Sequence, residues 1–536
     1  MIFVNPTLNN TNLMETIKKM NPWWENVKWH ERDSDYNDRV RKSPFIHRWF
    51  WILNRAIEQL IQGQGKYDVL VMAGPRRTGK TSLMKKLIEK NCQHIGKNSI
   101  YLRLDEHLIR KSVEDLGLRE ILSNTIEKVG LNEPLIIVID EASALDGWDV
   151  HIKNVIDSFT SEGKRFLLMV TGSLGLRLIQ GSTNILARRG DIPYLGNIAN
   201  PATILPYKFS EYAEALKLIS QYVRFLELLK RVERQEILLN LAKPNVLDSK
   251  VQRLKILYDK FQAALQALFN DYYLVSGGFP LILYELIIRG DFKKLDKKWY
   301  DEIGGSLLQD LKYTNLREDI VRCFLEYLTE TNKMSPSLDL NKLENYIRAK
   351  ANLSKKDLER FRIEDYIEYF CNTFTMVKAT EIAQIKEITE ITREIKLFIT
   401  DPFIFHSIML KDYSDPLIES KKFLENPSQM GILVEHVVCG HFLRLTTRPT
   451  LYYHIYRQQD KTLGEIDCIC HYKHTYIPIE VKYTENEQIL RNTANITNSI
   501  LNNLEIKSRP IIVSKSMFEI QPDSAIIPAN TFLLLF

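Results

Sequence analysis

The chain has 536 residues, of which 45% are hydrophobic and 26% charged, and its net charge is +5. This composition excludes a mainly disordered chain, because enough apolar surface is present to offset the entropy lost on folding. No uncharged apolar run approaches the ~20 residues that cross a bilayer, so we expect no membrane partner. At roughly 150 residues per domain, the length predicts three to four domains. The small positive charge permits nucleic acid as a partner but argues only weakly for it.

The start of the chain and its cysteines indicate a cellular compartment. No basic stretch followed by an apolar core opens the sequence, so no secretory signal is expected. The six cysteines lie far apart except for Cys468 and Cys470, and this CxC pair is not the CxxC spacing of a zinc or redox site. Free buried thiols in a reducing compartment fit this pattern. We therefore expect a cytoplasmic protein.

The first 65 residues are rich in tryptophan. Five of the seven tryptophans lie there: Trp23, Trp24, Trp29, Trp49 and Trp51. They would either pack an N-terminal arm and first helix against the following domain or stack on a base of a bound nucleotide. The sequence does not separate these two interpretations.

Short β-rich runs then alternate with amphipathic segments between Lys66 and Pro206. Such alternation is typical of βαβ units around a parallel sheet. The expected strands are Asp68–Ala73, Ser99–Leu104, Leu135–Asp140, Phe166–Gly172 and a last one near Pro201–Leu205. From Phe209 to Ile391 the pattern is mostly helical. Short alternating strands return after Gly431 and end in the apolar run Phe532–Phe536.

A phosphate-binding motif follows the first of these strands. Residues 74–82 fit GxxxxGK(S/T) between an apolar run and an amphipathic helix, which is the context that the motif requires. The loop's backbone N–H groups and the helix N-terminus would face the phosphates, Lys80 would reach the β/γ-phosphates, and Thr81 would ligate Mg²⁺. We therefore expect ATP and Mg²⁺ as cofactors. The residues predicted to bind the nucleotide are Gly74, Pro75, Arg76, Arg77, Thr78, Gly79, Lys80, Thr81 and Ser82.

A second motif supports the first one. The apolar run Leu135–Ile139 reads as a buried parallel strand, and it ends in Asp140 and Glu141. Acidic residues at the carboxyl end of such a strand face the ligand crevice. Asp140 would hold Mg²⁺ through water, and Glu141 would orient and deprotonate the attacking water. The pair predicts ATP hydrolysis.

Other candidate residues leave alternatives open. Ser173 follows the strand that ends at Gly172, where its hydroxyl would either sense the γ-phosphate or cap the strand. Arg188 and Arg189 are best placed by chain order to stabilise the transition state, with Arg76 and Arg77 as rivals. Each of these arginines would equally form a surface salt bridge.

These motifs together resemble the AAA+ ATPases of archaea and bacteria whose C-terminus carries a PD-(D/E)XK nuclease-like domain. The resemblance covers roughly residues 20–536 and includes the paired arginines of the loop, the strand end at 171–173, and the segments 205–212, 277–280 and 396–402. It implies that Gly278 and Pro280, in a helical lid, lie near the adenine. The segment at 187–189 is Ala-Arg-Arg where relatives commonly show Gly-Arg, so the acting arginine stays open.

The middle of the chain, about residues 305–395, would correspond in this resemblance to a winged-helix domain. Its candidate helix-turn-helix, Asn341–Asp365, holds seven Lys/Arg against five Asp/Glu. This small excess is weak evidence for phosphate contacts. The segment would either read DNA or serve as a packing module that relays the nucleotide state.

The C-terminal region carries a pattern of carboxylates and one lysine. Glu480 and Lys482 share one face of a strand, and a helix upstream carries Glu435. Between them, Gly464–Asp467 reads as another strand with two acids, Glu465 and Asp467, on one face. This order resembles the PD-(D/E)XK fold, which implies that Asp467 and Glu480 bind Mg²⁺ or Mn²⁺ and that Lys482 positions the attacking water. Glu435 would be a further ligand or orient one. The alternative is a degenerate nuclease fold kept for dimerisation or for holding DNA.

We therefore predict a multidomain α/β protein. The expected parts are a Trp-rich arm (1–65), a P-loop AAA+ parallel-sheet ATPase core (66–210), a helical lid (211–304), a winged-helix-like domain (305–425) and a PD-(D/E)XK nuclease-like domain (426–536). The expected function is Mg²⁺-dependent ATP hydrolysis that controls DNA binding or cleavage, with DNA and a second copy of the chain as partners. The alternative is a nucleotide-switched signalling ATPase whose nuclease fold is an inactive interaction module.

Overall fold

The computed structural model describes residues 6–33, 36–41, 48–173, 175–196, 198, 201–215, 231–246, 249–288, 295–351, 353, 357, 360–382, 393–445, 449–458 and 461–536. The chain divides into two compact units, Met1–Leu205 (unit 1) and Pro206–Phe536 (unit 2). Among the described residues, no helix has both the length and the apolar character needed to cross a membrane.

Unit 1 is built on a five-stranded sheet of order β2-β3-β4-β1-β5. Every neighbouring pair of strands is parallel. The strands are β1 Tyr67–Ala73, β2 Ser99–Arg103, β3 Leu135–Asp140, β4 Phe166–Gly172 and β5 Ala202–Thr203. All six residues of β3 are buried, as a strand between two layers of helices requires. The parallel sheet predicted from the alternating pattern is confirmed.

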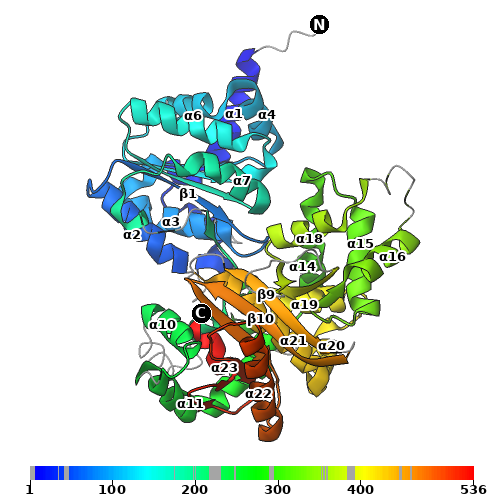
Figure 1. The fold of residues 1–536 in the computed structure, drawn as a ribbon. Coiled ribbons are helices and arrows are strands. Elements are labelled where there is room, and N and C mark those ends of the chain that lie inside the picture. Colours follow the sequence, from blue (N-terminus) through cyan, green and yellow to red (C-terminus); the bar gives the residue numbers. More distant parts are fainter. Residues whose placement is uncertain are drawn as a thin grey trace. The chain divides into compact units, whose positions relative to one another are not determined.

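Helices cover both faces of this sheet. The chain crosses from β1 to the far edge at β2 and then returns through β3 and β4, so right-handed crossovers place the first connecting helix opposite the later ones. Figure 1 shows α3 beside α2 on one face, with α6 and α7 on the other. The helices of unit 1 are α1 Pro6–Met20, α2 Arg48–Ile61, α3 Lys80–Ile95, α4 His107–Leu116, α5 Leu118–Val129, α6 Trp148–Ser161 and α7 Gly175–Leu186.

The N-terminal tryptophans pack mainly into unit 1. The indole N–H groups of Trp23 and Trp24 donate to the carbonyl oxygen at the start of β2, at 3.3 and 2.7 Å. The indole of Trp49 donates to a carbonyl of β5 at 3.2 Å. These three side chains and Trp29 are buried, whereas Trp51 is 59% exposed. The contacts favour the packing interpretation for the four buried rings.

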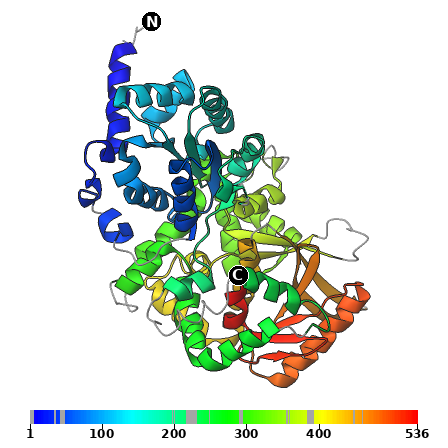
Figure 2. The same cartoon turned by 90° about the vertical axis from the view of Figure 1, so that its left-hand side faces the viewer.

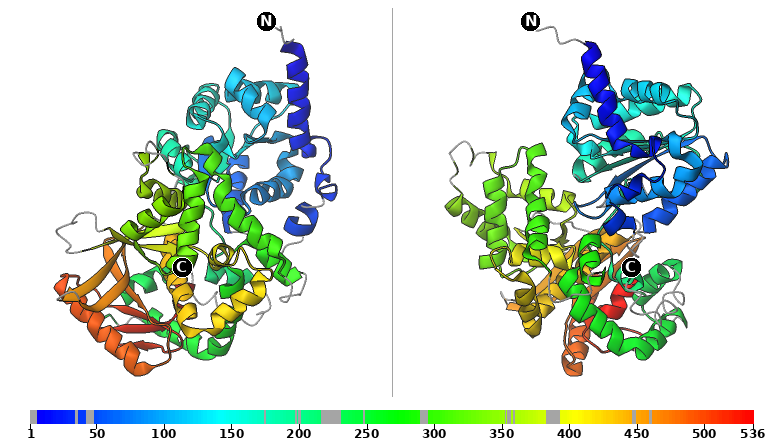
Figure 3. Two further views of the ribbon diagram at one scale, coloured as in Figure 1. Left: turned by 90° about the vertical axis from the view of Figure 1, so that its right-hand side faces the viewer. Right: turned by 180° about the vertical axis from the view of Figure 1, so that it is seen from behind.

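Unit 2 contains a nine-stranded mixed sheet of order β13-β14-β12-β11-β10-β9-β7-β8-β6. The strands are β6 Ser337–Asp339, β7 Met376–Glu381, β8 Glu394–Ile399, β9 Thr450–Gln458, β10 Lys461–Tyr472, β11 Thr475–Val481, β12 Ile511–Ser514, β13 Glu519–Ile520 and β14 Ala525–Pro528. The antiparallel pair β7–β8 joins the C-terminal strands through the parallel pairing of Thr380 and Glu381 in β7 with β9. In the left view of Figure 3, the yellow strands of this pair continue into the orange strands. The middle of the chain and its C-terminal region therefore share one sheet.

The helices of unit 2 surround this sheet. They are α8 Phe209–Ala215, α10 Arg231–Leu241, α11 Ser249–Ala267, α12 Leu274–Ser276, α13 Pro280–Ile288, α14 Lys297–Gln309, α15 Glu318–Glu326, α16 Leu340–Lys350, α18 Ile363–Asn372, α19 Pro402–Met409, α20 Pro416–Glu425, α21 Pro427–Gly440, α22 Glu487–Asn503 and α23 Ala529–Phe532. The predicted helix-turn-helix is described only in part, since several residues between α16 and α18 lie outside the described ranges.

Two segments differ from the sequence-based expectation. The stretch read as mostly helical contains β6 and β7, and β7 is fixed by pairing with β8 and β9 rather than by its local pattern. The apolar run at the C-terminus forms α23 and a 3-10 helix, Leu533–Leu535, instead of ending the strands. Short apolar runs do not distinguish a buried strand from a buried helix, so the pattern alone was insufficient.

A β-bulge shapes the C-terminal half of the sheet. The register between β10 and β9 shifts between Ile466 and Ile469. Both isoleucines pack with Ile500 and Leu501 of α22, although they lie three residues apart. Figure 2 shows α22 along the red and orange strands. The bulge allows Asp467 to point to the opposite face of the sheet, where α21 packs.

Candidate functional site

The phosphate loop connects the end of β1 with the start of α3. Arg77 and Gly79 have left-handed backbones, with φ of 65° and 85°, which makes the loop curl between strand and helix. A Cβ atom at Gly74 would lie 1.9 Å from the carbonyl oxygen of Ile204, so only glycine fits beside β5. The Thr78 hydroxyl donates to the Pro75 carbonyl at 2.9 Å and closes the loop.

Lys80 is the first residue of α3, and its ammonium lies against the loop. It donates to the carbonyl oxygens of Gly74 and Pro75 at 2.9 and 2.8 Å. The side chain is buried. These contacts hold one positive charge inside the curve of the loop, at the N-terminus of a 16-residue helix.

Asp140, at the end of β3, accepts hydrogen bonds from hydroxyl groups of neighbouring elements. Thr81 and Tyr101 each donate to its Oδ2 at 2.6 Å, and the Thr171 hydroxyl donates to its Oδ1. Burial and the adjacent Asp140 charge raise the pKa of the Tyr101 phenol well above its usual range, so this group stays a donor. Side chains from the start of α3 and from β2 and β4 therefore converge on the carboxylate at the end of β3.

Glu141 and Ser173 also come together at this edge of the sheet. The Ser173 hydroxyl donates to Glu141 Oε2 at 3.2 Å. The Glu141 backbone is left-handed, with φ of 52°, and its N–H donates to Asp140 Oδ1 at 3.1 Å. Non-glycine residues adopt this backbone rarely, and such positions concentrate at functional sites. The structure thus places Thr81, Asp140, Glu141 and Ser173 beside one another, and their roles toward Mg²⁺ and water stay predictions.

Arg188 and Arg189 do not join this cluster within the chain. Arg188 pairs with Asp157 on α6 at 2.7 Å, and Arg189 pairs at 2.8 Å with Asp68, which is fully buried. Asp68 is the second residue of the seven-residue β1, whereas the phosphate loop follows its last residue. At ~3.3 Å per residue these positions lie roughly 17 Å apart. Arg76 and Arg77 are part of the loop itself.

Gly278 and Pro280 lie in unit 2, where Pro280 begins α13. The Gly278 N–H donates to Asp401 Oδ2 at 2.8 Å, and its carbonyl accepts from the Tyr207 N–H at 2.7 Å. A Cβ atom at Gly278 would lie 1.9 Å from the Tyr207 carbonyl oxygen. Three of the segments quoted for the resemblance therefore meet in one buried cluster. The contact of Gly278 and Pro280 with adenine stays a prediction.

Three carboxylates of the C-terminal region lie close together, and two of them, Asp467 and Glu480, are predicted metal ligands. One oxygen from each of Glu465, Asp467 and Glu480 lies within 4.8 Å of the others. The Asp467 N–H donates to Glu480 Oε2 at 3.0 Å, and the Val481 N–H donates to Asp467 Oδ2 at 2.8 Å. The Lys482 ammonium lies 2.7 Å from Glu480 Oε1. The strands β10 and β11 therefore present one acidic cluster. We call these residues, together with Glu435 of α21, the carboxylate centre.

The sequence interpretation missed Lys396 in this centre. Its ammonium lies 2.5 Å from Asp467 Oδ1, 2.9 Å from Glu435 Oε1 and 3.9 Å from Glu465 Oε2. The Lys396 side chain is 2% exposed. A charged residue inside the otherwise apolar buried run of β8 was the available signal, since buried lysines are rare unless paired.

The pKa values in the carboxylate centre follow from burial and mutual charge. Burial, followed by the Asp467 charge, raises the pKa of Glu435 to about 8. The same two causes raise the pKa of Glu480 well above its usual range. Burial would also raise the pKa of Asp467, but the charges of Lys396 and Lys482 outweigh it and lower that pKa. Asp467 is therefore the carboxylate that both ammonium groups stabilise as an anion.

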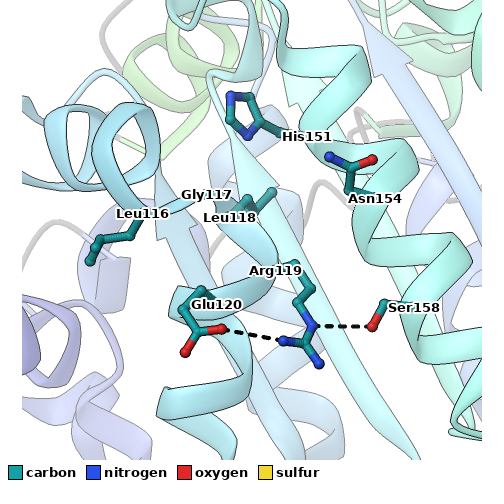
Figure 4. A pocket seen from close by; sticks show the side chains of 8 residues that line it. All are labelled: Leu116, Gly117, Leu118, Arg119, Glu120, His151, Asn154 and Ser158. Carbon is teal, nitrogen blue, oxygen red and sulfur yellow. Dashed lines mark hydrogen bonds and ion pairs between the residues drawn. The ribbon is translucent and has the colours of Figure 1, made fainter.

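A separate pocket lies between α5 and α6 in unit 1, with a cavity volume of about 280 Å³. Figure 4 shows Arg119 in this pocket, where it bonds to Ser158 and Glu120 at 3.1 and 3.2 Å. None of its lining residues is a predicted site residue. The pocket therefore does not belong to the phosphate site.

Two families match parts of the chain. Residues 66–213 match a family described as an AAA domain (AAA_14), and residues 430–532 match a domain of unknown function (DUF4143). No curated protein matches the chain.

Solved structures show distant likeness. C. elegans PCH-2 is 18% identical, with a TM-score of 0.25, over 36% of this chain and 51% of that chain, so about half of its length is spanned. A variant of Thermotoga maritima RuvB is 15% identical over 61% of this chain and 87% of that chain, with a TM-score of 0.26. The Aeropyrum pernix ORC1 protein in complex with DNA is 14% identical over 69% and 92%, with a TM-score of 0.31. At these TM-scores the likenesses carry no argument about function. The match of residues 66–213 to the AAA domain family agrees with the parallel sheet and the phosphate loop of unit 1.

Proposed function

We propose that the chain is a Mg²⁺-dependent ATPase whose nucleotide state controls DNA binding or cleavage by unit 2. The observation that carries the ATPase part is the 2.6 Å hydrogen bond between Thr81 and Asp140. It brings the hydroxyl of the phosphate loop and the carboxylate of β3 together, and both groups are oxygen ligands of the kind that Mg²⁺ prefers.

Each residue of this site has a chemical task in the proposal. Lys80 and the loop N–H groups bind the β- and γ-phosphates, and Thr81 and Asp140 hold Mg²⁺, which neutralises phosphate charge when bound. Glu141 orients a water and accepts its proton, while Ser173 holds the Glu141 carboxylate in place through the 3.2 Å bond. The arginine that stabilises the transition state is Arg76 or Arg77 in the same chain, since Arg188 and Arg189 pair with Asp157 and Asp68.

For unit 2 we propose a winged-helix element and a nuclease-like domain. The helices α15, α16 and α18 with the hairpin β7–β8 are the proposed winged helix, and α21, β9–β12 and α22 are the proposed PD-(D/E)XK core. Asp467 and Glu480, with Glu435, would hold Mg²⁺ or Mn²⁺, and Lys482 would position a water. The metal would supply a Lewis acid for phosphate when bound.

A second function is favoured by the Lys396 ammonium. Its contacts with Asp467 and Glu435 neutralise negative charge that a metal would need. An ATPase whose C-terminal domain is an inactive interaction module fits this pairing. ATP-dependent binding of a partner protein without DNA would favour this second function.

The test is the DNA affinity of the Glu141→Gln variant with ATP, with ADP and without nucleotide, using single-stranded, duplex and branched DNA. This variant should bind ATP but hydrolyse it slowly, because an amide cannot accept the water's proton. We expect the affinity with ATP to differ from the other two values, and linkage requires DNA to change ATP affinity by the same factor. The control is Lys80→Ala, whose DNA affinity should not respond to ATP. Three equal affinities would contradict the proposal.

A further inference from the structure

The carboxylate centre contains a cation that belongs to the chain itself. The Lys396 ammonium contacts carboxylates from α21 and β10, at 2.9 Å to Glu435 and 2.5 Å to Asp467. These two distances are those of charge-assisted hydrogen bonds. A third carboxylate, Glu465, lies 3.9 Å away. Lys396 is thus enclosed by acidic groups of two further elements.

We propose that Lys396 takes the place of a divalent cation in the carboxylate centre, so that Mg²⁺ or Mn²⁺ binds there only after Lys396 has left. The inference concerns the same centre as the proposed nuclease-like domain and rests on that proposal only for the choice of probe cation.

The oxygen atoms that a metal would use already have partners. Asp467 Oδ1 accepts from Lys396 and Asp467 Oδ2 accepts from the Val481 N–H. Glu480 Oε2 accepts from the Asp467 N–H, and Glu480 Oε1 pairs with Lys482. A divalent ion needs oxygen ligands at ~2.0–2.6 Å and would lie beside the Lys396 ammonium if it shared Asp467 Oδ1. Two cations sharing one buried oxygen repel each other strongly, since the interior screens charge poorly. The donor set therefore fits a metal, but the set together with Lys396 does not.

Lys396 lies on a strand from another part of the chain than Asp467. It lies on β8, opposite Ala379 of β7 and Ser337 of β6. These strands belong to the middle of the chain, whereas Asp467 belongs to the C-terminal region. The charge that occupies the carboxylate centre therefore comes from a strand of the middle segment, which pairing with β6 and β7 holds in place.

The test is Mn²⁺ binding by the nucleotide-free full chain, measured by calorimetry and by the electron spin resonance of free Mn²⁺. The Lys396→Met variant keeps the side-chain length but removes the charge, which leaves the carboxylates uncompensated. We expect it to bind Mn²⁺ at least tenfold more tightly than the parent. The double variant Lys396→Met/Asp467→Asn should lose this gain. Any Mn²⁺ bound at the phosphate loop is common to all variants and cancels in the comparison.

Thermal unfolding provides a second readout. Mn²⁺ should raise the melting temperature of Lys396→Met by more than it raises that of the parent. The matched control is Lys208→Met, which removes a buried ammonium bonded to the main-chain oxygen of Phe536 and should respond to Mn²⁺ as the parent does. If Lys396→Met does not fold, Lys396→Gln keeps a donor without the charge and serves in the same assay.

Two results would overturn the inference. One is Mn²⁺ binding by the parent that matches the Lys396 variants and is lost in Asp467→Asn. The other is a folded Lys396 variant with no gain over the parent. DNA cleavage and ATP hydrolysis, assayed on the same samples, report on the proposed function instead. A variant that gains Mn²⁺ but does not cleave DNA would support the inference and contradict cleavage.

Discussion

The acidic sites around Asp140 and around Asp467, both within the described residues, differ in the groups that bond to the central carboxylate. Asp140 accepts hydrogen bonds from the hydroxyls of Thr81, Tyr101 and Thr171, which carry no charge. Asp467 accepts from the Lys396 ammonium and from a backbone N–H. Neutral donors orient a carboxylate and leave its charge for a metal, whereas an ammonium also neutralises that charge. Convergence of carboxylates alone therefore does not define a metal site.

The largest expected effect is on ATP hydrolysis. Lys80→Ala should abolish tight ATP binding, because the phosphates lose the charge that the loop holds at 2.8–2.9 Å from its carbonyls. Glu141→Gln should keep ATP binding and slow turnover by on the order of 10²–10⁴-fold, the usual contribution of a general base. An equilibrium measurement of ATP binding detects the loss expected for Lys80→Ala, and the rate of phosphate release detects the slow turnover expected for Glu141→Gln. Hydrolysis by Lys80→Ala at the parent rate would contradict the site assignment.

The same substitution at the two central carboxylates should have unequal effects on stability. Asp467→Asn leaves the buried Lys396 charge with a weaker set of partners, and breaking a buried ion pair in this way costs about 3–5 kcal/mol. Asp140→Asn disturbs bonds from neutral hydroxyls and should cost only about 1–2 kcal/mol. Urea unfolding of both variants, followed separately for each transition, measures the difference. Equal losses would show that Lys396 does not neutralise Asp467.

Asp401 is intermediate between Asp140 and Asp467. Backbone N–H groups donate to its carboxylate, and the Arg444 guanidinium lies 4.0 Å from it. Burial raises its pKa from 3.8 to about 6, although Arg444 opposes this. The folded state therefore holds a proton that the unfolded state has released between about pH 4 and 6, so the free energy of unfolding falls as the pH rises through this window. The decrease should reach about 3 kcal/mol.

The control for this pH dependence is Asp401→Asn, which cannot titrate. Its unfolding free energy should lack the decrease between pH 4 and 6, even though the loss of one acceptor for the Gly278 or Phe403 N–H lowers stability at every pH. Denaturant titrations across this range compare the two proteins. An unchanged slope in the variant would assign the pH dependence to other groups.

The sequence predicted what local patterns determine. The phosphate loop and β3 were found because a fixed spacing of glycines and an uninterrupted apolar run each require one structure. The predicted pair Asp140 and Glu141 follows from the end of that run. Tyr101 was not found, because it reaches Asp140 only through the pairing of β2 with β3, and sheet order is not written in a local pattern.

Long-range pairing accounts for the remaining differences. Lys396 precedes Asp467 by 71 residues and lies on a strand of the middle segment, so no spacing rule links the two. The strand β7 was read as part of a helical stretch, since its identity depends on pairing with β8 and β9. Pairing between distant segments thus decided which cation lies in the carboxylate centre.

The smallest expected effect belongs to Tyr101→Phe, which removes one neutral donor from Asp140 and keeps the ring. Asp140 Oδ2 retains the Thr81 hydroxyl at 2.6 Å, so its orientation should persist and ATP hydrolysis should change by several-fold at most. The free energy of unfolding should fall by about 1 kcal/mol, the net value of one hydrogen bond. The measurement is ATP turnover against Mg²⁺ concentration beside urea unfolding, with Tyr67→Phe as the matched control in β1. A loss of turnover as large as that of Glu141→Gln would mean that the phenol contributes to the chemistry itself, and the neutral donors of this centre would then do more than orient Asp140.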